Sequence, residues 1–283
     1  MSVELADSIA ALRARLAPLR REGKAIGLVP TMGALHAGHV ELIRRARREC
    51  GCVVVSIFVN PIQFDRKDDF ERYPRPVADD MRVCEQEGVD VVFAPNAGEM
   101  YPRRQRSFVE VEALTDHLCG KFRPGHFRGV ATVVAKLFHI VEPQRAYFGE
   151  KDAQQLAVIR RMAVDLNMPL SIVEVPTVRE NDGLAVSSRN VYLDVEQRRS
   201  AAALYQSLTA ARELVAQGER EAAAIKRGGL EVLARQPAVR VEYFEVVDSD
   251  EMQPVERVEG PVRVAAAVWV GSTRLIDNVL VEV

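Results

Sequence analysis

The chain has 283 residues, of which 48% are hydrophobic and 28% are charged, a composition typical of a soluble globular protein. No apolar run reaches the roughly 18 residues that a membrane-spanning helix needs, so we expect no membrane partner. The 38 Lys and Arg residues balance 40 Asp and Glu residues, and the resulting net charge of −2 gives no global attraction for nucleic acid.

The chain begins with "MSVELADSIAALRARLAPLR", in which apolar and basic residues alternate at helical spacing. This pattern predicts an amphipathic helix. The stretch contains acidic residues and lacks the continuous apolar core of a signal peptide, so we expect the protein to be cytoplasmic.

The four cysteines, Cys50, Cys52, Cys84 and Cys119, form no C-x-x-C pair and have no metal-ligand spacing. We interpret them as buried or unreactive thiols of a reducing compartment. A zinc site remains the alternative.

Short β-rich runs alternate with amphipathic segments over the first 175 residues or so. This order predicts a parallel sheet covered by helices on both faces, a Rossmann-like doubly wound α/β fold, in a domain spanning residues 1–180. The predicted strands are "AIGLVP" (25–30), "GCVVVSIFVN" (51–60), "VDVVFAP" (89–95), "AYFG" (146–149) and "LSIVEVP" (170–176).

The pattern changes after about residue 190. Two Ala-rich helices are predicted at 196–218 and 220–236, followed by strands at 241–248, 262–271 and 273–283 with no helix between them. We therefore expect a smaller α+β domain over residues 181–283, with a three-stranded antiparallel sheet.

The stretch "VPTMGALHAGH", residues 29–39, places two histidines at a predicted strand-to-helix turn. Backbone amides at a helix N-terminus are unpaired donors with partial positive charge, and the carboxyl end of a parallel strand is where open α/β folds bind ligands. His36 and His39 can donate hydrogen bonds to phosphate oxygens there, and Gly38 leaves room for a nucleotide. The pattern therefore indicates a phosphate site.

Two other interpretations of this pair stay open. His36 could cap a turn while His39 is a partly buried core residue, as many single histidines are. Alternatively, an H-x-x-H pair could bind a metal ion, although no other Cys or His is spaced to complete such a site.

His-x-Gly-His after a first strand resembles the signature of an adenylyl-transferring superfamily that includes class I aminoacyl-tRNA synthetases and small nucleotidyltransferases. Further motifs follow in order along the chain, and together they resemble the pantothenate synthetase (pantoate–β-alanine ligase) family. These motifs are "PTMGALHAGH", "SIFVNPIQF", "YPR", "RPGHFRGVATVV", "FGEKDAQQL" and "NDGLAVSSRN".

The resemblance implies an enzyme that condenses pantoate with β-alanine at the expense of ATP. In the first step the pantoate carboxylate attacks the α-phosphorus of ATP, which gives pantoyl adenylate and pyrophosphate. In the second step the amine of β-alanine attacks the acyl carbon, which gives pantothenate and AMP. The resemblance also implies Mg²⁺ with ATP, a homodimer, and a C-terminal lid with a hinge near 177–182.

The resemblance assigns catalysis to His36, His39 and Lys151. Ser187, Ser188 and Arg189 would form an anion clamp for the leaving phosphates, and Asp152 would hold the ribose. The implied ATP-binding residues are Met32, Gly33, Ala34, Leu35, His36, Ala37, Gly38, His39, Gly149, Glu150, Lys151, Asp152, Val178, Val186, Ser187, Ser188 and Arg189. On their own, Gly149–Asp152 could be a surface turn and Ser187–Asn190 a helix cap.

The pantoate pocket needs neutral hydrogen-bonding groups. We expect Gln63 and Gln155 to supply them, with Asn60, Arg123 and His126 shaping the same site; surface amides are the alternative for the two glutamines. Asp79 and Asp80 could attract magnesium or the ammonium of β-alanine, but acids in a first helical turn are more often dipole partners. The ligands of a metal ion are unknown.

Two rival functions remain at this stage. One is a nucleotidyltransferase that adenylates a different acid; a tRNA synthetase is disfavoured by the net negative charge. The other is a nucleotide-binding regulator without catalysis, which would have no use for both histidines, Lys151 and the Ser187–Arg189 clamp.

Overall fold

The computed structural model describes residues 3–282, which form two compact units. Within these residues, the first unit comprises 3–111, 124–150 and 158–176, and the second comprises 112–123, 151–157 and 177–282. No local pattern separates residues 112–123 and 151–157 from the N-terminal part of the chain. Both segments contact residues that are distant in sequence, and such contacts produce no local pattern of apolar residues that could predict them.

The first unit contains a six-stranded sheet in which every pairing is parallel, in the order β1-β4-β3-β2-β5-β6. The α/β prediction is confirmed. The strands are β1 (Glu4–Ala6), β2 (Ile26–Thr31), β3 (Cys52–Ile57), β4 (Val91–Phe93), β5 (Arg145–Gly149) and β6 (Ser171–Val175). All six residues of β3 are buried, as expected of a central strand covered on both faces.

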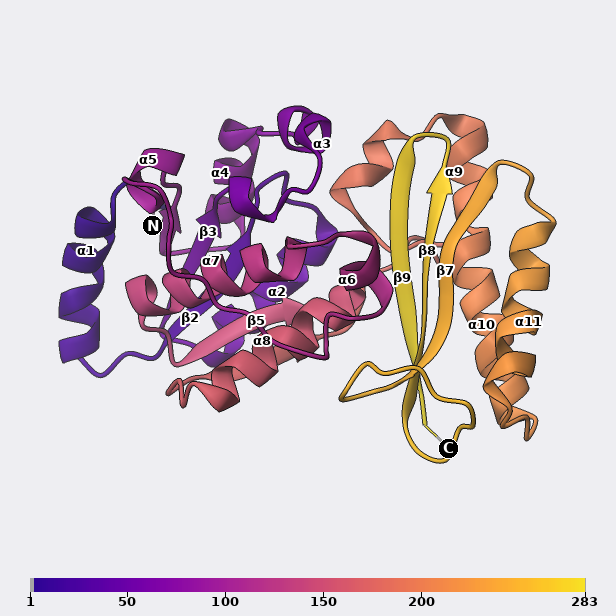
Figure 1. The fold of residues 1–283 in the computed structure, drawn as a ribbon. Helices are drawn as coiled ribbons and strands as arrows, with labels where there is room; N and C mark the ends of the chain where they lie inside the picture. Colours follow the sequence, from indigo (N-terminus) through magenta and orange to yellow (C-terminus); the bar gives the residue numbers. More distant parts are fainter. Residues whose placement is uncertain (1–2, 283) are drawn as a thin grey trace. The chain divides into compact units, whose positions relative to one another are not determined.

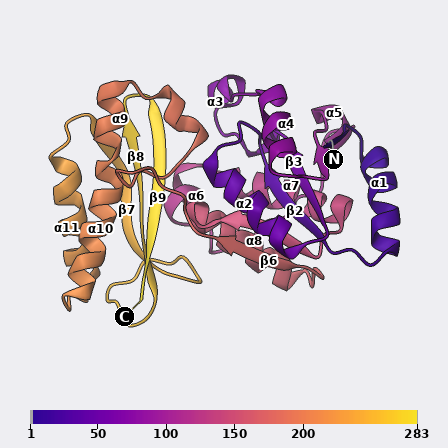
Figure 2. The same ribbon diagram turned by 180° about the vertical axis from the view of Figure 1, so that it is seen from behind.

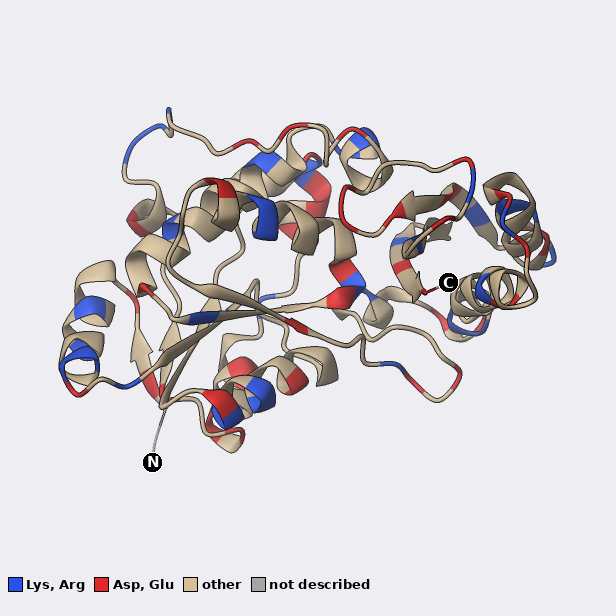
Figure 3. Cartoon of the chain, turned by 90° about the horizontal axis from the view of Figure 1, so that it is seen from below, with Lys and Arg blue, Asp and Glu red and all other residues tan. Residues whose placement is uncertain are grey.

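Helices cover the sheet on both faces (Figures 1 and 2). Helices α2 (Ala37–Glu49) and α4 (Val77–Gln86) share one hydrophobic cluster with β2, β3 and β4, in which Ile43 and Cys84 are fully buried. Helices α1 (Ile9–Arg21) and α7 (His126–Val141) contact each other. Lys, Arg, Asp and Glu gather on the helices and loops, whereas the strands of this sheet carry few of them (Figure 3).

One short strand was not predicted. Glu4–Ala6 pairs with β4 as an edge strand, although these residues match the helical spacing of the following segment. Ser8 then caps α1 by accepting a hydrogen bond from the Ala11 backbone N–H at 3.3 Å. The predicted helix therefore begins only at Ile9, because tertiary pairing outweighs local periodicity for three residues.

The remaining elements of the chain are short or belong to the second unit in whole or part. They are η1 (Pro61–Gln63), α3 (Lys67–Arg72), α5 (Ala97–Met100), α6 (Leu118–Phe122), η2 (Glu150–Asp152), α8 (Ala153–Asp165), η3 (Ser188–Tyr192), α9 (Val195–Ala201), α10 (Ala203–Ala216), α11 (Ala222–Ala234), β7 (Val239–Asp248), β8 (Val262–Val270) and β9 (Thr273–Val281). The first predicted Ala-rich helix is divided into α9 and α10 at Ala202.

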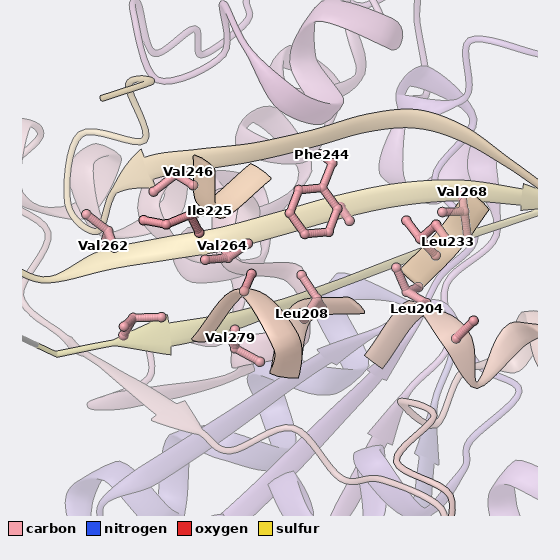
Figure 4. Close-up of a cluster of buried hydrophobic side chains, with 14 of the residues drawn as sticks. Leu204, Leu208, Ile225, Leu233, Phe244, Val246, Val262, Val264, Val268 and Val279 are labelled. Carbon is pink, nitrogen blue, oxygen red and sulfur yellow. The ribbon is translucent and has the colours of Figure 1, made fainter. Parts of the chain in front are cut away.

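The second unit contains the antiparallel sheet β7-β8-β9, as predicted. Helices α10 and α11 pack on it, and their apolar faces close a core with Leu208, Ile225, Phe244 and Val264 (Figure 4). A Cβ atom at Gly229 would lie only 2.1 Å from the Phe244 ring, so glycine permits α11 to approach β7 this closely.

Candidate functional site

The strand order of the first unit defines a topological switch point beside β2. The chain runs from β2 through β3 to β4 on one side, and then returns to β5 and β6 on the other side of β2. In open α/β sheets, ligands bind outside the carboxyl ends of the strands at such a point. Thr31 ends β2 and Gly149 ends β5, so two of the sequence motifs flank the switch point.

The opening motif forms the turn from β2 into α2. Helix α2 begins at Ala37, and His36 is its N-cap. The Nδ1 atom of His36 accepts a hydrogen bond from the Gly38 backbone N–H at 3.1 Å, and the Nδ1 atom of His39 accepts one from the His36 backbone N–H at 3.3 Å. A reciprocal capping box therefore satisfies two donors of the first helical turn.

These hydrogen bonds fix the tautomers of both histidines. Because each Nδ1 atom accepts from a backbone N–H, the proton of each neutral ring resides on Nε2. The two rings are stacked, with centroids 4.0 Å apart and an interplanar angle of 29°. The pair thus combines a capping role with two Nε2–H donors, so capping and phosphate binding are compatible roles.

Glycines make room for this turn. A Cβ atom at Gly38 would lie 3.0 Å from the His36 ring, so a larger residue would displace the N-cap. Gly33 has φ +82°, and a Cβ atom there would lie 2.8 Å from an oxygen of Asp80. The conformation of the turn therefore depends on both positions.

Asp80, on α4, anchors the turn from outside. Its two carboxylate oxygens accept hydrogen bonds from the backbone N–H groups of Ala34 at 2.9 Å and Leu35 at 2.7 Å. The side chain is buried, and burial raises its pKa above the usual value, while the two amides act in the opposite direction. Both oxygens of Asp80 are thus engaged by the protein backbone.

Asp79 differs from its neighbour. Its carboxylate is exposed and pairs with Arg82 within the same helix. The two acids of the "VADDM" segment therefore have separate roles, one structural and one on the surface.

Gln63 lies in η1, past the carboxyl end of β3, and is buried. Its Nε2 atom is 3.0 Å from the Met32 sulfur, which belongs to the loop after β2. Asn60 is also buried, with 1% of its surface exposed, and its amide donates to Gln63 Oε1 at 3.0 Å. The first unit therefore brings Met32, Asn60 and Gln63 together.

The "GEKD" motif, residues 149–152, crosses a boundary between the two units: Glu150 is the last residue of a segment of the first unit, and Lys151 begins a segment of the second. Gly149 ends β5, and space is open around its Cα because an added Cβ would have no neighbour within 4 Å. Lys151 lies in the second unit with its Nζ 3.6 Å from the Asp152 carboxylate, and its backbone carbonyl accepts from Asn278 at 3.1 Å.

Gln155 lies in α8 and is half-buried, whereas the adjacent Gln154 is buried. Gln154 holds the segment around α6, donating to the carbonyls of Leu114 at 2.9 Å and His117 at 2.8 Å. Arg123, at the C-terminus of α6, is half-buried. Two of the predicted pocket residues, Gln155 and Arg123, thus belong to the second unit.

Residues 178–186 form a tight hairpin. The Val186 backbone N–H donates to the Val178 carbonyl at 3.0 Å, and Arg179 bridges to Ala185. The Ser187 side chain then caps η3 by accepting from the Arg189 backbone N–H at 3.2 Å, so the helix-cap interpretation of this segment is realised.

The hairpin is anchored by ion pairs. Arg179 binds Asp277 on β9 through two hydrogen bonds, of 2.6 Å and 3.0 Å, and Asp277 is buried. Arg198 on α9 pairs with Glu180 and Asp182. Because Asn278, next to Asp277, holds the Lys151 carbonyl, β9 connects the hairpin with Lys151 inside the second unit.

Four residues that support the predicted ones were not foreseen, namely Asp80 as an anchor, Tyr101, Gln154 and Arg179. Each contacts a partner between 34 and 98 residues away in sequence. No local spacing indicates such a partner. The four cysteines are buried and form no disulfide.

Within residues 3–282, no group of three or more His, Cys, Asp or Glu side chains is arranged to hold a metal ion. None of the helices in that range is long and apolar enough to cross a membrane.

Comparison with known proteins identifies the family. The sequence model of the pantoate-beta-alanine ligase family matches residues 4–280 of this chain. Proteins named pantothenate synthetase from Moorella thermoacetica and Heliobacterium modesticaldum are 53% and 54% identical to this chain over 281 residues, which are 99% of this chain and 99% and 100% of the two relatives.

Solved structures give the same result. Pantothenate synthetase from Thermus thermophilus is 48% identical, with a TM-score of 0.93 over 98% of this chain and 99% of that one. A pantoate-beta-alanine ligase from Francisella tularensis, solved in complex with beta-gamma ATP and beta-alanine, is 32% identical, with a TM-score of 0.81 over 98% and 97% of the two chains. The chain belongs to the pantoate–β-alanine ligase family.

Proposed function

We propose that this chain catalyses the ATP-dependent condensation of (R)-pantoate with β-alanine through a pantoyl adenylate. The observation that supports this most strongly is the His36–His39 pair, whose Nε2–H donors lie at the N-terminus of α2 beside the switch point of the parallel sheet. The chain's membership of the pantoate–β-alanine ligase family supports the same activity. The Francisella relative was solved with an ATP compound and beta-alanine, which supports the same two substrates here.

In the first step, a pantoate carboxylate oxygen forms a bond to the α-phosphorus of ATP, and the bond from that phosphorus to the bridging oxygen of the β-phosphate breaks. Negative charge grows on the departing pyrophosphate and on the α-phosphoryl oxygens. Preorganised donors aimed at this charge lower the barrier most. We assign this role to His36, His39 and Lys151, with the backbone amides at the start of α2.

In the second step, the amine of β-alanine attacks the acyl carbon, a C–N bond forms, and AMP departs with the electrons of the C–O bond. The attacking nitrogen must be a free amine, so its ammonium proton is lost first. This step consumes a reactive intermediate that water would otherwise hydrolyse. We assign exclusion of water to residues 181–283, acting as a lid with a hinge near 177–182.

The remaining assignments follow the family motifs. Ser187, Ser188 and Arg189 would receive the leaving phosphates, and Asp152 the ribose. Gln63 and Gln155 would bind pantoate, with Asn60 and Arg123 shaping the pocket. The ATP contacts would be completed by Met32, Gly33, Ala34, Leu35, Ala37, Gly38, Gly149, Glu150, Val178 and Val186.

Mg²⁺ is proposed to arrive with the phosphates of ATP. Magnesium commonly keeps several waters and is held by substrate phosphates with one or two carboxylates. The Asp80 carboxylate is occupied by two backbone amides, so Asp79 is the more available acid of the pair.

We further propose that the protein is a homodimer in the cytoplasm. We also propose that residues 1–180 form the catalytic domain and residues 181–283 form the lid domain.

The direct test measures pyrophosphate and AMP released from Mg·ATP with D-pantoate, with and without β-alanine. We expect release to require pantoate and to continue over many turnovers only when β-alanine is present. Release with an acid other than pantoate would show a different adenylating enzyme. ATP binding without any release would show a regulator.

A further inference from the structure

A chain of hydrogen bonds runs from the half-buried Tyr101 through the buried Asn60 to the buried Gln63. The Tyr101 hydroxyl is 2.7 Å from Asn60 Oδ1. The Asn60 Nδ2 group donates to the backbone carbonyl of Gly129 at 3.1 Å and to Gln63 Oε1 at 3.0 Å. All of these residues lie in the first unit, and none of these bonds depends on the second.

The Gly129 carbonyl sets the direction of this chain. An amide side chain can be rotated by 180° with little change in shape, so its orientation follows from its partners. The carbonyl of Gly129 can only accept a hydrogen bond, so Asn60 must turn Nδ2 toward it. Asn60 Oδ1 then faces Tyr101, whose hydroxyl must donate.

The same reasoning fixes Gln63. Because Asn60 Nδ2 donates its second proton, the facing atom of Gln63 must be Oε1. Gln63 therefore presents Nε2 on its other side, toward Met32 in the loop after β2. A hydrogen-bond donor, and not an acceptor, is thus directed to the edge of the sheet where the substrate is proposed to bind.

Packing prevents Gln63 from relaxing out of this position. A Cβ atom at Gly129 would lie 2.4 Å from the Ile62 carbonyl oxygen and 2.6 Å from the Gln63 Cα, so α7 and η1 are in direct backbone contact. The ring of His126 adds a hydrogen bond between Nδ1 and the Gln63 carbonyl at 2.8 Å. Burial raises the pKa of the Tyr101 phenol, so the hydroxyl keeps its proton across the neutral range.

We propose that Tyr101 and Asn60 are positioning residues that lock Gln63 as a donor toward an oxygen of the acid substrate. This inference rests on the proposed function, in which Gln63 binds pantoate. A locked N–H donor suits a hydroxyl or carboxylate oxygen and disfavours an ammonium, which has only donors. Gln63 would therefore select the acid over β-alanine at this position.

The test compares Tyr101→Phe with Tyr147→Phe. Tyr147 lies in the first unit as well and is fully buried, and its hydroxyl donates to Glu49 at 3.0 Å, outside the chain from Tyr101 to Gln63. In Tyr101→Phe, we expect the KM for pantoate to rise about fivefold to tenfold, while the KM for ATP changes less than about twofold, because the loss concerns one neutral hydrogen bond. Tyr147→Phe should leave both constants unchanged.

The outcomes separate positioning from general destabilisation. A structural role alone would lower the melting temperatures of both variants and leave the KM for pantoate unchanged in the folded enzyme, and that result would overturn the proposal. An equal rise in the KM values for ATP and pantoate would overturn it as well.

A measurement on the unmodified protein covers the case in which Tyr101→Phe does not fold. NMR of the side-chain amides should show Asn60 NH₂ protons that exchange slowly with solvent, and a Gln63 NH₂ signal that shifts when pantoate is added without ATP. Fast exchange at Asn60 would refute the positioning role. If wild-type protein shows no pantoate-dependent turnover, the proposed function fails, whereas slow Asn60 exchange would still support the locked orientation of Gln63.

Discussion

The loop 33–36 in the first unit and the hairpin 178–186 in the second unit are anchored by different means. One buried carboxylate, Asp80, holds the loop through two backbone amides. Two arginines, Arg179 and Arg198, hold the hairpin through ion pairs with Asp277, Glu180 and Asp182. The loop is held by hydrogen bonds from its own backbone N–H groups, while the hairpin is held by ion pairs between side chains. The two segments should therefore respond differently to substitution, salt and pH.

The largest expected effect is on the hairpin. Replacing Arg179 by Met leaves the buried Asp277 carboxylate without its partner, which should lower the free energy of unfolding by about 3–5 kcal/mol. Trp269, the single tryptophan of the chain, lies in β8, so its fluorescence during urea unfolding reports on the second unit. The double variant Arg179→Met/Asp277→Leu should recover most of the loss. Equal destabilisation in both variants would contradict an ion-pair anchor.

Next in size are the two donors proposed to act in the chemistry, one in each unit. His39→Ala and Lys151→Ala should each lower the rate of adenylation by about 10²–10³-fold, because each removes a donor to developing charge. Both variants should keep the far-UV circular dichroism of the parent. Lys226→Ala removes a lysine that pairs with Glu245 in the second unit, and this control should retain full activity. Unimpaired turnover in either test variant would refute its assigned role.

A smaller effect is expected at the anchor of the loop. In Asp80→Asn, one of the two oxygens becomes an NH₂ group that faces a backbone N–H, and the unsatisfied donor should cost about 1–3 kcal/mol. Amide hydrogen exchange at Ala34 and Leu35 should accelerate. Asp79→Asn changes an exposed acid on the same helix and should alter neither exchange nor turnover. Matching behaviour of the two variants would refute the anchoring role.

The smallest expected effect concerns pH. The hydrogen bond from Arg198 holds the pKa of Asp182 below its usual value. A group with a lowered pKa in the folded state stabilises it above the unfolded pKa, at about 4, and this contribution is lost as the pH falls through the folded value. Since the Asp182 side chain is exposed, the contribution should be well under about 1 kcal/mol.

Arg198→Gln tests this directly, because it should return the pKa of Asp182 toward its ordinary value in an NMR titration. The variant should also flatten the loss of stability between about pH 4 and about pH 3. A titration of Asp182 that is identical in both proteins would show that Arg198 does not control this acid.

Much of the fold could be predicted because its signals are local. The buried run 52–57 and the alternation of strands and helices identified the parallel sheet, and the absence of helices after residue 236 identified the antiparallel one. The strand Glu4–Ala6 was missed because three residues carry no period of their own. The break at Ala202 was missed because alanine has a high helix propensity, so the sequence there predicts a continuous helix.

For the candidate site, too, local sequence signals predicted some residues, while residues placed by contacts distant in sequence were missed. His36, His39 and Gly38 were predictable from residue types at a strand-to-helix turn, since helix termini need caps and offer donors. The anchor Asp80 was not predictable, because 45 residues separate it from Leu35. Asn60 was expected to shape the pocket, whereas its hydrogen bonds to Tyr101 and Gly129 emerge only from the tertiary structure.

The most direct test of the central claim follows oxygen through the reaction. Pantoate labelled with ¹⁸O in its carboxylate is incubated with Mg·ATP and β-alanine, and AMP, pyrophosphate and pantothenate are analysed by mass spectrometry. A pantoyl adenylate predicts one ¹⁸O atom in AMP and none in pyrophosphate, because the attacked phosphorus keeps the carboxylate oxygen. Label in inorganic phosphate together with ADP, or no label in AMP, would contradict adenylation of pantoate by this protein.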